Sequence, residues 1–176
     1  MKTLCKLLLL LFFITSCKKE PKISPPNDPH WGEAMAGKNG ILWTATPYAA
    51  ANRNVGYGLD ILIDSLDEYH LLRERLSFYK VPIIPGTYLV SNTLPQTNDS
   101  LVGSALFYVD VDILYGVYDI LEADSSSFIT LISYDTVTKE IKGTFDVTFI
   151  ASIKPYPGAP DTLRLRNGTF HTKVIK

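Results

Sequence analysis

The stretch FITLISYDTVTKEIKGTFDVTF, residues 128–149, decides the fold class of this chain. In its second half, apolar residues or glycine alternate with Lys, Thr and Asp from Ile141 to Phe149. A period of two is typical of a strand with one buried face, and residues 135–139 have the composition of a turn. The stretch therefore predicts a β-hairpin whose apolar side chains share one face.

Similar short segments lie on both sides of this hairpin. They are rich in β-branched and aromatic residues and cover residues 41–45, 57–63, 86–90, 105–112, 115–121, 163–165 and 170–174. In segment 105–112 we expect Phe107 and Val109 on the apolar face, and Asp110 and Asp112 on the polar face. Eight to ten short strands separated by turns predict an all-β domain, either an antiparallel sandwich or a barrel-like sandwich.

Residues 64–76 fit two structures. Residues 65–68 match a helix capping box, and one helical stripe could consist of Leu66, Tyr69, Leu72 and Leu76. Leu72, Leu76 and Phe78 also fit one face of a strand, with Arg73, Arg75 and Tyr79 on the other. We favour a turn over residues 64–68 followed by a strand from about residue 70.

Residues 1–16 predict a lipoprotein signal peptide. Lys2 and Lys6 precede an apolar run, residues 7–14, that is too short to span a bilayer. The sequence ITSC at residues 14–17 resembles the lipobox of bacterial lipoproteins. The resemblance implies a diacylglyceryl group on the Cys17 sulfur, cleavage before Cys17 and acylation of the new amino group. An ordinary cleaved signal is the alternative.

Residues 17–38 predict the lipidated Cys17 followed by a proline-rich flexible tether, and residues 39–176 a single β-sandwich domain. We expect Trp31, within the tether, to pack back on the domain. Lys18 follows Cys17, where an Asp would resemble an inner-membrane retention signal, so we expect anchoring in the outer membrane, facing the periplasm or the cell surface. No later segment is long and apolar enough to span a membrane, which predicts a soluble domain tethered by its lipid.

Charge and cysteine content exclude several classes of protein. The formal net charge of −1 argues against nucleic-acid binding. Cys5 leaves with the signal and Cys17 carries lipid, so the mature chain has no thiol for a disulfide, a cysteine nucleophile or a thiolate zinc site. We expect no metal and no cofactor.

The tripeptide Gly-Thr-aromatic occurs three times, at residues 86–88, 143–145 and 168–170. With Trp43-Thr44-Ala45 and the lipobox, these repeats resemble a family of uncharacterised β-rich outer-membrane lipoproteins of Bacteroidota. The resemblance implies a β-rich domain over residues 39–176 and an outer-membrane address. It implies no particular activity.

A second short motif, Asp then Ser or Thr then an aliphatic residue, occurs four times. It resembles the O-glycosylation acceptor of exported Bacteroidota proteins, and the implied acceptors are Ser65, Ser100, Thr136 and Thr162. The alternative is that this tripeptide is simply a turn that enters a strand.

Catalytic motifs are not found in the sequence. The three histidines, His30, His70 and His171, form no metal-binding pair, and no nucleophile elbow or phosphate-binding glycine loop is present. Asp110 and Asp112 have the spacing for a cation or a carboxylate pair, although the polar face of a strand also explains them. We therefore assign no catalytic residue.

Three functions remain open. The first is a non-enzymatic, membrane-anchored lipoprotein whose β-domain binds an envelope protein or an extracellular glycan, with tyrosines supplying the recognition face. The second is a lipocalin-like carrier of a small apolar ligand, which requires an internal cavity of a few hundred Å³. The third is a hydrolase, which requires His70 or His171 to lie near acidic and hydroxyl partners.

Overall fold

The computed structural model describes residues 29–51, 58–92, 102–110, 112–122 and 126–175. The regular elements in these ranges are ten β-strands, so the all-β prediction is confirmed. The strands are β1 (Glu33–Lys38), β2 (Ile41–Ala51), β3 (Leu59–Leu66), β4 (Leu72–Val81), β5 (Gly86–Ser91), β6 (Val102–Asp110), β7 (Ile113–Ile120), β8 (Phe128–Tyr134), β9 (Glu140–Ile153) and β10 (Thr162–Ile175). The described ranges contain no helix that is long and apolar enough to cross a membrane.

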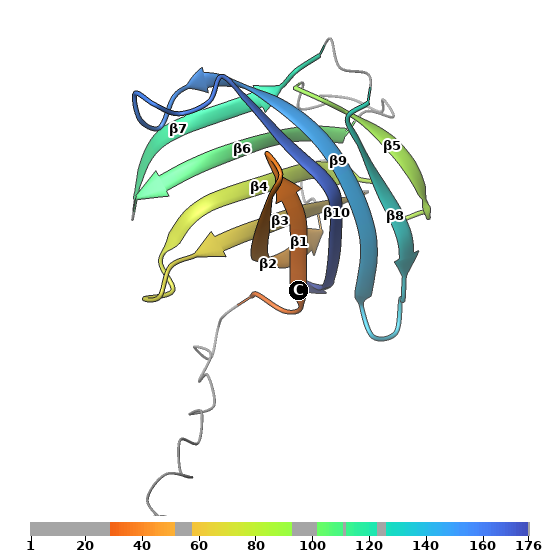
Figure 1. Cartoon of the computed structure of the whole chain (residues 1–176). Helices are drawn as coiled ribbons and strands as arrows, with labels where there is room; N and C mark the ends of the chain where they lie inside the picture. Colours follow the sequence, from red (N-terminus) through yellow and green to blue (C-terminus); the bar gives the residue numbers. More distant parts are fainter. Residues whose placement is uncertain (1–28, 52–57, 93–101, 111, 123–125, 176) are drawn as a thin grey trace, which may run out of the picture.

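The ten strands form one sheet whose pairings return to their start. From β2 the pairing runs through β3, β4, β6, β7, β9 and β10 to β1, which pairs again with β2. Figure 1 shows the consequence, since β9 and β10 curve over the face of the sheet formed by β4 and β6. A single sheet that curls into a ring therefore replaces the two packed sheets of a sandwich.

The ring is irregular between β6 and β9. The space between these two strands is divided between β7 and the β5–β8 pair. Strand β9 pairs with β8 over residues 141–146 and with β7 over residues 149–153. The short contacts β5–β6 and β2–β10 are parallel, so the sheet is mixed.

Apolar side chains from all sides of the ring fill its interior. The alternation predicted for residues 141–149 is confirmed, since Ile141, Phe145, Val147 and Phe149 are fully buried. The ring of Phe78 on β4 packs against that of Phe145 with 5.5 Å between centroids. Each such side chain contributes about 1.5–3 kcal/mol by leaving water. These side chains occupy the middle of the interior, where a lipocalin-like carrier would hold its ligand.

Two of the Gly-Thr-aromatic repeats pair with each other. In the β9–β10 ladder, Gly143 lies opposite Phe170 and Gly168 lies opposite Phe145. A Cβ atom on Gly143 would lie 2.3 Å from the Phe170 ring, and one on Gly168 would lie 2.4 Å from the Phe145 ring. Each phenylalanine therefore covers the glycine of the other repeat, which explains why the two residue types recur together.

The tether predicted to end at residue 38 is too long. Residues 33–38 form β1, between β10 and β2, with Ala34 only 2% and Ala36 only 3% exposed. Asn39 and Gly40 both have positive φ, 49° and 84°, as a two-residue type I′ turn requires. The buried positions of β1 are alanines, which are only weakly apolar, so the alternation barely indicates a strand. The Asn39-Gly40 pair, which is typical of a hairpin turn, is the stronger indication that a strand precedes it.

Trp31 packs against the domain, as expected. Its ring meets that of His171 edge-on at 5.1 Å, and Lys173 Nζ lies 4.3 Å from the Trp31 ring centroid. Its backbone N–H donates to the carbonyl of Pro47 on β2. Residues 29–32 therefore lie against the outer face of the sheet before β1 begins.

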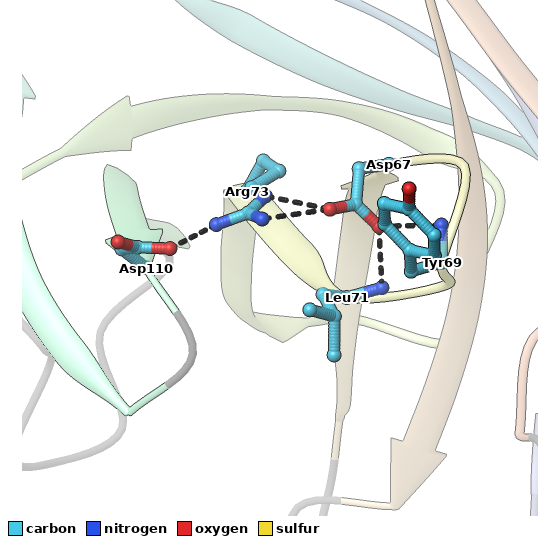
Figure 2. A network of polar contacts seen from close by, with 5 residues as sticks. All are labelled: Asp67, Tyr69, Leu71, Arg73 and Asp110. Carbon is cyan, nitrogen blue, oxygen red and sulfur yellow. Dashed lines mark hydrogen bonds and ion pairs between the residues drawn. The ribbon is translucent and has the colours of Figure 1, made fainter.

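Segment 64–76 contains a turn and a strand, as favoured, but the turn comes later than predicted. Asp64 and Ser65 belong to β3, and the chain reverses between Asp67 and Leu71. The Asp67 carboxylate accepts hydrogen bonds from the backbone N–H groups of Tyr69 and Leu71, at 2.8 and 2.9 Å (Figure 2). These bonds stabilise the turn in the way expected of an aspartate.

The face assignment predicted for β6 is wrong. Leu106 is fully buried, whereas Phe107 and Val109 are only half-buried on the opposite face. Both faces of this strand carry large apolar residues, so its alternation alone is ambiguous. The neighbouring strands decide, because Leu106 lies between Leu76 and Tyr118, which are both fully buried.

Candidate ligand site at the open end of the ring

Four connections lie at the same end of the ring, which we call the open end. Neighbouring strands in the ring run antiparallel, so the links β1–β2, β3–β4, β6–β7 and β9–β10 all come there. A pocket of about 310 Å³ lies between the β1–β2 link, β6 and the β9–β10 link. We call it the mouth pocket, and its lining includes Lys38, Trp43, Tyr108, Tyr156 and Pro160.

Aromatic rings form much of the mouth pocket. Trp43 on β2 is 8% exposed, and Tyr156 on the β9–β10 link is largely exposed. The Tyr108 ring packs on the Tyr118 ring at 5.9 Å, and the Tyr118 hydroxyl donates to the Pro160 carbonyl at 2.7 Å. The β9–β10 link is thereby fixed over the strand that carries Tyr118. The pocket thus offers flat apolar faces, of which the Trp43 and Tyr108 rings are held by packing and the Tyr156 ring is exposed.

An ion pair crosses the interior beside this pocket. Lys38 Nζ, on β1, lies 2.5 Å from Glu74 Oε2 on β4 and donates to the Tyr108 hydroxyl on β6 at 2.8 Å. Neither β4 nor β6 pairs with β1, so Lys38 reaches across the ring. Burial and the charge of Glu74 raise the pKa of Tyr108, which keeps its hydroxyl protonated.

Two buried polar atoms beside the mouth pocket have no hydrogen-bond partner among the described residues. They are Glu74 Oε1, an acceptor, and Trp43 Nε1, a donor. Trp43 lines the pocket, and Glu74 bonds to Lys38, which also lines it. Unpaired buried polar groups cost roughly 1–3 kcal/mol each, and such groups call for an explanation. A molecule that carries several hydroxyl groups could pair with both.

The other buried carboxylate, Asp64, is fully paired. Arg75 donates to both of its oxygens, from Nε and Nη2, at 2.7 Å each, and His30 Nε2 lies 3.0 Å from Oδ2. Burial alone would raise the pKa of Asp64, but the hydrogen bonds and charges of Arg75 and His30 outweigh it and hold the pKa below its ordinary value. Asp64 therefore acts as an ionised structural anchor.

His70 lies in the turn between β3 and β4, where it is exposed. It lines a pocket of about 410 Å³ together with His30, Asp64, Thr44 and Thr46. Asp64 in that pocket is already bonded to Arg75, and in the described part of the chain no hydrogen bond joins the His70 ring to an acid or a hydroxyl. The pocket thus collects the residue types that a hydrolase needs without aligning them.

His171 faces the outside of β10, as the alternation predicts. Its Nε2 lies 3.2 Å from Glu140 Oε2, and Lys173 Nζ lies 3.4 Å from Glu140 Oε1. The histidine and lysine lower the pKa of the Glu140 carboxyl. The arrangement is a surface ion-pair cluster beside Trp31.

Asp110 and Asp112 do not form a pair on one strand. Asp110 ends β6, where it accepts a hydrogen bond from Arg73, and Asp112 lies in the following turn. Figure 2 shows that Arg73 also binds Asp67, through Nε at 2.9 Å and Nη2 at 2.7 Å. This network joins the β3–β4 link to the end of β6 and so fixes the rim of the open end. Across the described ranges, no three His, Asp or Glu side chains gather as metal ligands.

The candidate modification sites differ in their accessibility. Thr136 is exposed at the β8–β9 turn, where the Asp135 carboxylate accepts the N–H groups of Val137 and Thr138. Ser65 lies within β3 and Thr162 opens β10, and both are half-buried. Ser100 and the lipid attachment residue Cys17 lie outside the described residues.

The residues of the mouth pocket were not found from the sequence. The predicted tether includes Lys38, and Glu74 belongs to the segment whose pattern fits either a helix or a strand. One signal was available, because Glu74 alternates with Leu72, Leu76 and Phe78 on the face that was expected to be apolar. A charge at an inward position is a marker of a special environment.

Comparison with known proteins gives no further guide to the site: no protein-family model, no curated protein and no solved structure matches the chain.

Proposed function

We propose that the protein is a lipoprotein anchored in the outer membrane through Cys17, and that its β-domain is not an enzyme but binds an extracellular glycan at the mouth pocket. The lipobox at residues 14–17 supports the anchor. Residues 29–32 lead into β1 at its far end, so the open end points away from the place where the chain enters the domain. This geometry suits a tethered domain that presents its pocket outward.

The observation that carries the glycan proposal is the combination of aromatic faces and unpaired polar atoms at one pocket. Sugar rings offer C–H faces that pack on aromatic rings, as Trp43, Tyr108 and Tyr156 would allow. Sugar hydroxyls both donate and accept hydrogen bonds, so they suit Glu74 Oε1 and Trp43 Nε1. An apolar ligand would leave both polar atoms unpaired.

An envelope protein is the second candidate partner. Ile41 and Leu42 on β2, and Ile113 and Leu114 on β7, are exposed beside the open-end links. Exposed aliphatic side chains of this kind are typical of protein-binding surfaces. This reading predicts binding through the rim of the open end and makes no use of the pocket interior.

Binding of oligosaccharides to the full-length lipoprotein in detergent tests the proposal. A glycan array selects ligands, and isothermal titration measures their dissociation constants for the wild type, Tyr156→Ala and Glu74→Gln. We expect each variant to weaken binding by about fivefold to tenfold, through loss of a stacking face or of a charged acceptor.

Tyr69→Ala is the matched control, because Tyr69 is also an exposed tyrosine on an open-end link but does not line the mouth pocket. The proposal is overturned if no oligosaccharide binds, or if Tyr156→Ala and Tyr69→Ala have the same effect. Loss of binding to an envelope protein in an Ile113→Ser variant, which changes the rim outside the mouth pocket, without any saccharide binding, would favour the second candidate.

A further inference from the structure

A second pocket adjoins the mouth pocket at Asn39. It lies on the outer face of β1 and β10, and its volume is about 600 Å³. Its lining includes Gly37, Asn39, Gly40, Arg164, Arg166 and Asn167, and we call it the arginine pocket. Since Asn39 lines both pockets, the two are neighbours on either side of the β1–β2 turn.

The arginine pocket carries positive charge and no acidic lining residue. Arg164 is exposed, and no carboxylate in the described ranges forms an ion pair with it. Arg166, the second arginine of the lining, donates from Nη2 to the Thr148 hydroxyl at 2.7 Å. The nearby Asp161 is paired with Lys154 at 2.6 Å. On a chain with a net charge of −1, this pocket is suited to a negative group.

The wall between the two pockets is low and rigid. It consists of the Asn39-Gly40 turn, and a Cβ atom on Gly40 would meet nothing within 4 Å. Asn39 is fixed to β10, because its N–H donates to the Arg164 carbonyl and its Oδ1 accepts the Arg164 N–H, both at 2.8 Å. A chain-like ligand can therefore cross the turn and contact both pockets.

Resting on the proposed function, we infer that the glycan is acidic: a carboxylate or sulfate group of one sugar binds Arg164, while a neighbouring sugar occupies the mouth pocket. The planar guanidinium fork matches the two oxygens of such a group. The arginine pocket selects for charge, and the mouth pocket supplies the stacking that neutral and acidic sugars share.

The test uses matched oligosaccharides that differ only in charge. Tetrasaccharides of uronic acids are compared with their methyl esters, and sulfated tetrasaccharides with their unsulfated forms, by titration into the full-length lipoprotein in detergent. For the acidic forms that bind, we expect esterification or desulfation to weaken binding by about tenfold, the value of one charge-assisted contact. Arg164→Gln should cause the same loss, and raising the salt concentration should reduce the acidic preference.

Lys142→Gln is the matched control, since it removes an exposed positive charge from β9 outside both pockets. If neutral forms bind as tightly as acidic ones and Arg164→Gln changes nothing, the inference is overturned while the glycan proposal stands. If Lys142→Gln weakens acidic binding as much as Arg164→Gln, the attraction is a general charge effect and the inference fails. If no form binds, both proposals fail.

Discussion

Asp64 and Glu74 are two buried carboxylates on neighbouring strands, one residue apart in register, yet on opposite faces of the same sheet. In the β3–β4 ladder Asp64 lies opposite Arg75, and Ser65 lies opposite Glu74. Asp64 is 1% exposed beneath the outer residues His30 and Arg75, while Glu74 is 7% exposed in the interior. Their burial is nearly equal, so their surroundings make the difference.

That difference separates a structural carboxylate from one that is ready for a ligand. Both oxygens of Asp64 receive hydrogen bonds from charged side chains. Glu74 has one oxygen bonded to Lys38, which lines the mouth pocket, and the other buried and unpaired among the described residues. A completely satisfied charge fixes a fold, whereas a half-satisfied one retains capacity for a partner.

The largest expected effect comes from breaking the Asp64 pair. Arg75→Met should lower the free energy of unfolding by about 3 kcal/mol, because it leaves a buried carboxylate with only His30. Urea denaturation followed by tryptophan fluorescence measures the loss. Arg73→Met is the control, since Arg73 pairs at the rim with the half-buried Asp67 and the exposed Asp110, which both retain contact with water. A loss in Arg73→Met that equals the loss in Arg75→Met would remove the distinction between structural and surface pairs.

Breaking the Glu74 pair should cost less. Lys38→Met is expected to lower the free energy of unfolding by about 2 kcal/mol, because the carboxylate beside the mouth pocket can recover part of its hydration. Adding Glu74→Leu should restore the stability, while saccharide binding should stay weaker than in the wild type because the charged acceptor is missing. If the double variant is as unstable as the single one, the ion pair stabilises the fold and is not kept for a ligand.

Neutral isosteres test the two carboxylates directly. Asp64→Asn should cost about 1–2 kcal/mol more stability than Glu74→Gln, because it disrupts three charge-assisted hydrogen bonds instead of one. Urea denaturation curves of the two variants, each compared with the wild type, measure the two losses of stability. Equal losses would contradict this reasoning, because Asp64 would then contribute no more to stability than Glu74 despite its three hydrogen bonds.

The smallest expected effect is a dependence on acid pH. Because the folded-state pKa of Asp64 lies below its unfolded value, the stability it contributes is present above about pH 4 and is lost as the pH falls through the folded pKa. The difference in unfolding free energy between the wild type and Asp64→Asn should therefore shrink between about pH 5 and pH 2. A difference that is constant over this range would contradict the assignment of Asp64 as an ionised anchor.

The sequence was sufficient for the strands whose two faces differ sharply. In β9, apolar residues or glycine alternate with Lys, Thr and Asp from Ile141 to Phe149, and both the strand and its buried face are as predicted. In β6, Leu106 and Phe107 are both large and apolar, so local pattern could not choose the face. In β1, Ala34 and Ala36 are buried without being strongly apolar, and only pairing with distant β10 reveals them as core.

The candidate site was beyond prediction for a related reason. Lys38, Glu74 and Tyr108 come from three strands separated by up to 70 positions, and no spacing in the sequence relates them. Their meeting depends on the closing of the ring, which is a property of the whole sheet. The alternation in β4 identifies Glu74 as a charged residue at an interior position, but it does not predict that Lys38 is its partner.

The reciprocal packing of Gly143 on Phe170 and of Gly168 on Phe145 has an evolutionary consequence. Because the ring of each phenylalanine occupies the space of a missing side chain, neither member of a pair can change size alone. In divergent descendants of this chain, a larger residue at position 168 should appear together with a smaller one at 145, whereas position 143 should remain glycine, because a Cβ atom there would also lie 2.4 Å from the Thr130 carbonyl oxygen. Covariation of 168 with 145, together with glycine at 143, would mark the ring-closing β9–β10 ladder even where little else of the sequence survives.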